Sequence, residues 1–129
     1  MSTLPVIQAF LSYLTDERHF SPYTARCYGA DLRQYVEFLS ESLGAAVNME
    51  QENNAFQARQ NGRSPAASDV VGAIIPKTIT RSICDTSTDA IRAFLTHLAE
   101  QNYSPATMAR KIATLRSFYK WAHKRGLVD

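Results

Sequence analysis

Hydrophobic residues recur at helical spacing in four segments of the chain, and the first covers about residues 4–16. Its apolar positions follow the i, i+3, i+4, i+7 spacing of a single helix face: Ile7, Phe10, Leu11 and Leu14. Thr3 or Ser2 can cap this helix, and Pro5 suits its first turn. The pattern predicts an amphipathic helix with one buried face.

The second segment begins at Ser21 and Pro22, a capping hydroxyl followed by a proline at the first helical position. Proline is tolerated there because its missing N–H has no partner to lose within the helix. The apolar stripe that follows consists of Tyr28, Leu32, Tyr35, Val36 and Leu39. We expect a helix that runs to about Leu43 and stops at Gly44.

Between residues 44 and 85 the helical pattern lapses. A polar stretch over 49–63 is followed by an alternating β-branched run over 70–83, which Gly72 and Pro76 interrupt. We interpret the whole segment as an irregular excursion with room for a short helix or hairpin. Because so long a loop is unusual in a compact domain, it is either an insertion or a disordered surface segment, and both alternatives stay open.

The third helix should begin at a cluster of capping residues over 86–89 and end near Asn102. Its apolar positions are Ile91, Phe94, Leu95 and Leu98. The fourth should start at Ser104 and Pro105 and close before Gly126. Its expected inner stripe is Met108, Ile112, Leu115, Tyr119 and Ala122. Phe118 and Trp121 lie off that stripe, so this helix should pack between neighbours.

Composition adds limits to this all-α picture. A chain of 129 residues suits one domain with its own core. Cys27 and Cys84 have neither disulfide-framework nor zinc-knuckle spacing, which favours a reducing, cytoplasmic setting without metal or small-molecule cofactor. The first residues have no basic leader pattern, and no window approaches the roughly eighteen apolar residues of a membrane span, so we expect no membrane partner.

Basic charge gathers at the end of the chain. Residues 103–129 contain six cations against Asp129, a net charge of +5, whereas residues 1–42 have a net charge of −2. The six cations are Arg110, Lys111, Arg116, Lys120, Lys124 and Arg125. Such a patch suits a polyanion, although a solvated helix face is the commoner reason for a run of charge.

The two Ser-Pro helix starts lie eighty-three positions apart in closely similar sequences, at 20–24 and 103–107. Helical geometry turns Arg26 and Arg33 away from the stripe of the second helix. On the fourth helix it turns Thr107, Arg110, Thr114 and Ser117 outward, with Lys111 on the flank. Helix N-termini, cations and hydroxyls together suit phosphate, and the same residue types read base edges in a major groove.

These residues also have structural interpretations. Ser21 and Ser104 are explained equally well as helix caps, whereas the adjacent cations Arg110 and Lys111 oppose the dipole of their helix and favour a phosphate role. The three histidines, His19, His97 and His123, lack metal-ligand spacing. No phosphate-binding glycine loop or hydrolase motif is found in the sequence.

Three stretches resemble the N-terminal core-binding domain of tyrosine recombinases of the Xer and phage-integrase type. They are F-S-P-Y-T-A-R-C-Y-G-A-D-L at 20–32, T-D-A-I-R-A-F-L-T-H-L at 88–98 and Y-S-P-A-T-M-A-R-K-I-A-T-L-R-S-F-Y-K-W-A at 103–122. With the first helix, the resemblance covers residues 4–43 and 85–127. It implies a SAM-like bundle of four to five helices, here with a long irregular insertion at about 44–85, in a single domain spanning residues 1–129.

The resemblance also implies a function. In this family the domain forms half of a clamp around duplex DNA, and its second and fourth helices approach the major groove. Carried over, it puts Thr24, Arg26, Thr107, Arg110 and Lys111 near DNA. The full set of predicted DNA-binding residues also contains Ser21, Tyr23, Arg33, Ser104 and Thr114. Family members often have an arginine after the tyrosine where this chain has Gly29, so one usual basic contact is absent.

The family cleaves DNA with a separate domain that carries an arginine, a lysine, a His-x-x-Arg motif and a tyrosine nucleophile. None of that set is found here, so we expect no enzymatic activity in this chain and interpret it as part of a larger recombinase. The expected partners are double-stranded DNA and other recombinase protomers in a synaptic assembly. The alternative is a helical protein-protein interaction module whose basic face is only solvated; an enzyme within these residues ranks last.

Overall fold

The structure is a computed structural model that describes residues 4–44, 48–60, 78–84 and 88–128. The described residues contain six helices and no strand: α1 (Pro5–Asp16), α2 (Pro22–Leu43), α3 (Met49–Gln60), α4 (Ile79–Cys84), α5 (Thr88–Ala99) and α6 (Pro105–Lys124). The predicted all-α class is confirmed. Within these residues no helix combines the length and apolar character that a membrane crossing requires.

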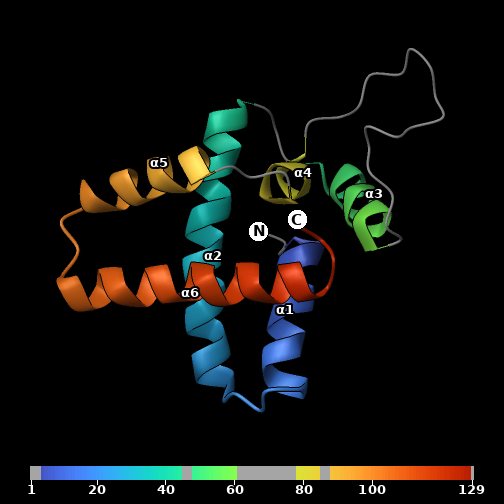
Figure 1. Cartoon of the computed structure of the whole chain (residues 1–129), viewed down its shortest axis with the longest axis horizontal. Helices are drawn as coiled ribbons and strands as arrows, with labels where there is room; N and C mark the ends of the chain where they lie inside the picture. Colours follow the sequence, from blue (N-terminus) through green and yellow to red (C-terminus); the bar gives the residue numbers. More distant parts are fainter. Residues whose placement is uncertain (1–3, 45–47, 61–77, 85–87, 129) are drawn as a thin grey trace.

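The helices are arranged around one crossing. Figure 1 shows α1 and α2 side by side with α6 lying across both and α5 beside the first half of α6; α4 packs against α2, and α3 packs against α4 and α1. Gly29 allows α1 and α2 to approach closely, because a Cβ there would lie 3.3 Å from Cδ1 of Leu11. The crossing places the middle of α2 against the N-terminal half of α6.

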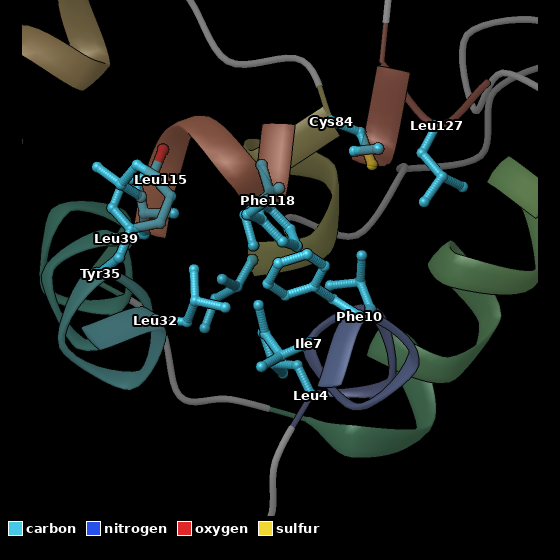
Figure 2. Packing of buried hydrophobic residues seen from close by; sticks show 14 of the residues in the cluster. Leu4, Ile7, Phe10, Leu32, Tyr35, Leu39, Cys84, Leu115, Phe118 and Leu127 are labelled. Carbon is cyan, nitrogen blue, oxygen red and sulfur yellow. The ribbon is translucent and has the colours of Figure 1, made fainter. Parts of the chain in front are cut away.

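Aromatic rings fill the core where the helices meet. Phe10 of α1 lies edge-on to Phe118 of α6, with ring centroids 5.4 Å apart, and equally near Trp121. Tyr35 of α2 lies 4.9 Å from Phe94 of α5. Figure 2 shows Phe10 and Phe118 directed toward one another among the aliphatic side chains. Packing of this kind supplies most of the stability of short helices.

The Ser-Pro helix starts are confirmed. Ser21 Oγ accepts the N–H of Thr24 at 3.1 Å, and Ser104 Oγ accepts the N–H of Thr107 at 3.2 Å. Gly44 ends α2 in the left-handed conformation, with a φ of 67°. The predicted cap of the first helix is wrong, because Leu4 occupies the N-cap position and makes no side-chain capping bond.

The irregular excursion predicted for residues 44–85 is wrong for its two described parts, which form α3 and α4 and bring the number of described helices to six. Phe56, Ile79 and Ile83 of these helices are buried in the common core. The β-branched run therefore forms a helix at Ile79–Cys84, while its earlier part lies outside the described residues. The third main helix also ends earlier than predicted, at Ala99.

Glu52 ties α3 to α4. Its carboxylate is 2% exposed and accepts the backbone N–H groups of Ile79 and Thr80, each at 2.8 Å, and the Thr80 hydroxyl at 2.7 Å. The first N–H groups of a helix have no partner within it, so an acceptor from elsewhere stabilises the helix start. A side chain on α3 thus caps α4 across the core.

Candidate nucleic-acid interface

A buried carboxylate joins α2 to α6 at their crossing. The Asp31 side chain is 3% exposed. Its Oδ1 accepts from Arg110 Nη2 and from Lys111 Nζ, both at 3.0 Å, and its Oδ2 accepts from the Thr114 hydroxyl at 2.9 Å. Three donors from successive turns of α6 therefore converge on one acid of α2, which satisfies a group that would be costly to bury alone.

The network continues toward the connection between α5 and α6. Lys111 Nζ also donates to Gln34 Oε1 at 2.8 Å, and Gln34 Nε2 donates to the Tyr103 hydroxyl at 2.9 Å. The same ammonium lies 5.0 Å from the centre of the Tyr103 ring, which is within range of a cation–π contact. The charge of Lys111 is thus directed into the protein.

The outward position predicted for Thr114 is wrong, and Lys111, predicted on the flank of the helix, is buried. Lys111 is 8% exposed and Thr114 is 1% exposed. The buried face of α6 consists of Lys111, Thr114, Leu115, Phe118, Trp121 and Ala122, so it is rotated relative to the predicted stripe. The large rings of Phe118 and Trp121 occupy the inner side of α6. Lys111 and Thr114 can be buried on the same side because Asp31 accepts a hydrogen bond from each.

Arg110 is the cation of this network that reaches solvent, because its side chain is 52% exposed. The hydrogen bond that Arg110 donates to Asp31 and the charge of that carboxylate raise the pKa of Arg110, so its guanidinium stays protonated. Tyr23, Cys27 and Asp31 follow one another on α2 at intervals of four residues, so the exposed Tyr23 lies toward the same side of that helix as Asp31.

A basic stripe continues along α6 from Arg110. Lys120 and Lys124 are exposed and, at about 100° per residue, lie on the same side of the helix as Arg110; we call these three the α6 basic stripe. Lys120 and Lys124 also line a hollow of about 270 Å³, together with Arg18 from the connection between α1 and α2. Aromatic rings line much of the rest of this hollow.

Arg18 was not predicted as a site residue, because a connection between helices has no hydrophobic periodicity that shows which way its side chains point. Its guanidinium lies 5.4 Å from the centre of the Phe20 ring, and a hydrogen bond with the Tyr13 hydroxyl raises its pKa. Asp31 and Gln34 were missed as well, since neither is basic. Their spacing on α2 could have indicated them, because Asp31 lies one turn and Gln34 two turns after Cys27, on the side that contacts α6.

The other predicted site residues are spread more widely. Arg26 and Arg33 are exposed, and within the described ranges neither side chain makes an ion pair or hydrogen bond. Thr24 and Thr107 each accept a hydrogen bond at 3.0 Å from the serine that caps their helix. Figure 1 shows the start of α2 beside the end of α1 and the start of α6 beside the end of α5, so the two caps do not form one site.

Histidine and acid positions do not suggest a metal centre. His97 packs against Phe38, with ring centroids 5.1 Å apart, and His19 has a φ of 57° in the connection between α1 and α2. Among the residues that the structure describes, no three histidine, cysteine or acidic side chains gather closely enough to hold an ion.

Replacing Ser104 with alanine should lower the free energy of unfolding by about 1 kcal/mol, the usual cost of losing an N-cap. Aspartate at the same position should restore most of that loss, because its carboxylate accepts the same N–H and favours the positive end of the helix. Urea denaturation followed by circular dichroism measures both changes. An alanine variant as stable as the parent would show that the cap contributes nothing.

Comparison with known proteins gives a family match. The chain matches the family described as the phage integrase N-terminal SAM-like domain over residues 7–61 and 74–126. Helices α2 to α6 lie wholly within the matched residues, including α3 and α4, and α1 lies within them from Ile7 onward. The part of the expected insertion that the match leaves out is residues 62–73. No solved structure matches the chain.

Curated relatives are tyrosine recombinases. XerC of Oceanobacillus iheyensis is 30% identical over 124 residues, which cover 95% of this chain and 28% of the relative. XerD of Rhizobium meliloti is 31% identical over 100 residues, or 76% of this chain and 28% of the relative. XerC of Halalkalibacterium halodurans is 32% identical over 115 residues, or 89% of this chain and 26% of the relative.

The chain thus spans between a quarter and a third of the length of these relatives. The family match extends over most of its 129 residues and takes in all of α2 to α6 and most of α1. The chain therefore belongs to the family of phage integrase N-terminal SAM-like domains.

Proposed function

We propose that this chain is the DNA-binding core-binding domain of a tyrosine recombinase and that it grips duplex DNA at half of a recombination site. The observation that carries the proposal is the difference in exposure between the cations of α6 and the acid at the crossing. Arg110, Lys120 and Lys124 are exposed on one side of the helix, whereas the acid at the crossing, Asp31, is buried. An anion that approaches this side meets cations without a competing exposed carboxylate from the crossing.

Phosphate contacts account for most of the expected affinity. Each cation that neutralises a phosphate releases condensed counterions, which makes binding stronger and sensitive to salt. The α6 basic stripe and Arg18 supply such cations on one side of α6. Thr107 and Tyr23 can add polar contacts to phosphate or sugar, and Arg26 and Arg33 of α2 extend the basic surface.

The wider assignment rests on the relatives, which are named as tyrosine recombinases. On this proposal the chain is the clamp-forming part of a recombinase that acts in DNA integration or recombination, and strand cleavage belongs to a catalytic domain outside these residues. Other recombinase protomers are partners in the assembled synapse. A cytoplasmic setting stays a prediction.

A second candidate function has one observation in its favour. A hollow of about 460 Å³ lies between α1, α3 and the end of α6, and Phe56, Trp121 and Leu127 form its apolar part. Such a surface suits a protein partner. Self-association that depends on protein concentration and does not change when duplex DNA is added would favour an interaction module over DNA binding.

Replacing Lys120 and Lys124 together with alanine should weaken binding to any duplex and make its salt dependence less steep. Each phosphate contact contributes about −0.9 to the slope of log K against log salt concentration, so the slope should become less negative by about 2. Fluorescence anisotropy with a labelled duplex across a series of salt concentrations measures this change.

Arg125→Ala is the matched control, since Arg125 is already paired with Glu17 at 2.8 Å. We expect its slope to equal that of the parent chain. A folded parent chain that binds no duplex even at low salt would refute the proposed function. An unchanged slope in the double variant would remove the α6 basic stripe from the interface.

A further inference from the structure

Among the cations of the basic surface, Arg110 is held in place by an acid. The side chains of Lys120, Lys124, Arg26 and Arg33 are exposed and, within the described ranges, make no ion pair or hydrogen bond. Arg110 instead donates from Nη2 to Asp31 Oδ1 at 3.0 Å. A free cation can follow a phosphate over several positions, whereas a bond to a base edge requires a defined direction. Arg110 meets that second requirement.

The acid that holds Arg110 is itself fixed. Lys111 Nζ bonds the same Oδ1 at 3.0 Å, and the Thr114 hydroxyl bonds Oδ2 at 2.9 Å, so both carboxylate oxygens are engaged. The carboxylate cannot turn without breaking one of these bonds. Arg110 therefore loses part of its rotamer freedom when the protein folds, and less remains to be lost when it binds a ligand.

The guanidinium keeps enough donors for a ligand. A guanidinium carries five N–H donors, and the bond from Nη2 to Asp31 engages one of them while the side chain stays 52% exposed. Asp31 lies between two cations, Arg110 and Lys111, so the cluster keeps a net charge of +1. It still attracts a pair of acceptors. Lys111 cannot serve in the same way, because its ammonium is directed to Asp31 and Gln34.

Guanine is the base that presents two neighbouring acceptors, O6 and N7, at its major-groove edge, and a bidentate arginine is the commonest specific contact to it. We propose that Arg110 reads the edge of a guanine and that Asp31 is the positioning residue that holds its guanidinium for this contact. This inference rests on the proposed function, because it requires duplex DNA at the α2–α6 crossing. It assigns base readout to Arg110 and leaves phosphate contacts to the free cations.

The test selects preferred sites from a pool of randomised duplexes with the 129-residue chain and its variants. The parent chain should enrich a G·C pair at one position by about tenfold or more over the other pairs. Arg110→Lys keeps the charge but cannot form the bidentate contact, so it should lose the preference at that position and keep the salt dependence. Asp31→Asn should also lose the preference, because its amide cannot hold Arg110 in the same way.

Lys120→Ala is the matched control, since it should bind every duplex more weakly and enrich the same sequence as the parent. Circular dichroism checks that each variant is folded, and Arg110→Lys keeps the test decisive if Asp31→Asn does not fold. Unchanged guanine preference in Arg110→Lys would overturn the inference. So would a parent chain that binds duplexes without any preference, an outcome that leaves the proposed function standing, whereas absence of all duplex binding would overturn both.

Discussion

Replacing Glu52 with alanine is expected to lower the free energy of unfolding by about 3–5 kcal/mol. The change leaves three buried donors without an acceptor, the N–H groups of Ile79 and Thr80 and the Thr80 hydroxyl. Each unsatisfied buried donor costs about 1–3 kcal/mol, and relaxation of α4 recovers part of the sum. Urea denaturation followed by circular dichroism at 222 nm, a standard helix band, measures this loss of stability.

Glu50→Ala is the control for this change, because Glu50 lies on the same helix and is exposed. It should alter stability by no more than about 0.5 kcal/mol. The stability of Glu52→Gln should lie between those of Glu50→Ala and Glu52→Ala, since the glutamine carbonyl oxygen still accepts a hydrogen bond but its NH2 group cannot. Equal stabilities for the variants at positions 50 and 52 would mean that α3 does not cap α4.

Replacing Lys111 with alanine is expected to cost about 2–4 kcal/mol of stability. Removal of one partner from a buried ion pair leaves the other charge poorly compensated, and that cost is about 3–5 kcal/mol for an isolated pair. Asp31 keeps Arg110 and Thr114 as donors, which moderates the loss. Thermal and urea denaturation both register the change as a lower midpoint.

The same variant separates a structural role from the DNA contact first predicted for Lys111. If its ammonium serves Asp31 and Gln34, the folded Lys111→Ala protein should bind duplex DNA with the salt slope of the parent chain. Lys120→Ala should show the reverse behaviour, with unchanged stability and a slope less negative by about 1. A Lys111→Ala chain of full stability and reduced slope would restore the phosphate role.

Helix starts could be predicted from sequence because their causes are local. Ser21 and Ser104 each need only a backbone N–H three residues later, and proline at the following position fixes the chain there. Gly44 likewise needs only its own left-handed conformation to end α2. Such features depend on neighbours in the chain, so periodicity and capping residues are sufficient to find them.

The buried face of α6 could not be predicted in the same way, because its partners are distant in sequence. Lys111 and Thr114 are polar, and their burial depends on Asp31, which lies about eighty positions earlier. A pattern that counts apolar residues places both outside. The exposure of the predicted site residues therefore differs from the prediction where their side chains join two helices, whereas Arg26 and Arg33 are exposed as predicted.

Helix α3 was missed for a related reason. Its buried positions are Glu52 and Phe56, an acid and a single ring, so no apolar stripe marks the inner face. Glu52 can be buried because α4, 27 positions later, supplies donors for both carboxylate oxygens. When another segment supplies the partners for the buried face of a helix, the sequence of that helix alone gives little indication that it is amphipathic.

The position of Trp121 has a consequence for spectroscopy. It is the only tryptophan of the chain, it is 6% exposed, and its ring lies 5.4 Å from Phe10 and 6.3 Å from Tyr13 of α1. Within the described residues its indole N–H has no hydrogen-bond partner. Indole emission depends on the polarity around the ring, so the fluorescence of Trp121 should change when α1 separates from α6. Intrinsic fluorescence therefore monitors the packing of the helix that carries the α6 basic stripe.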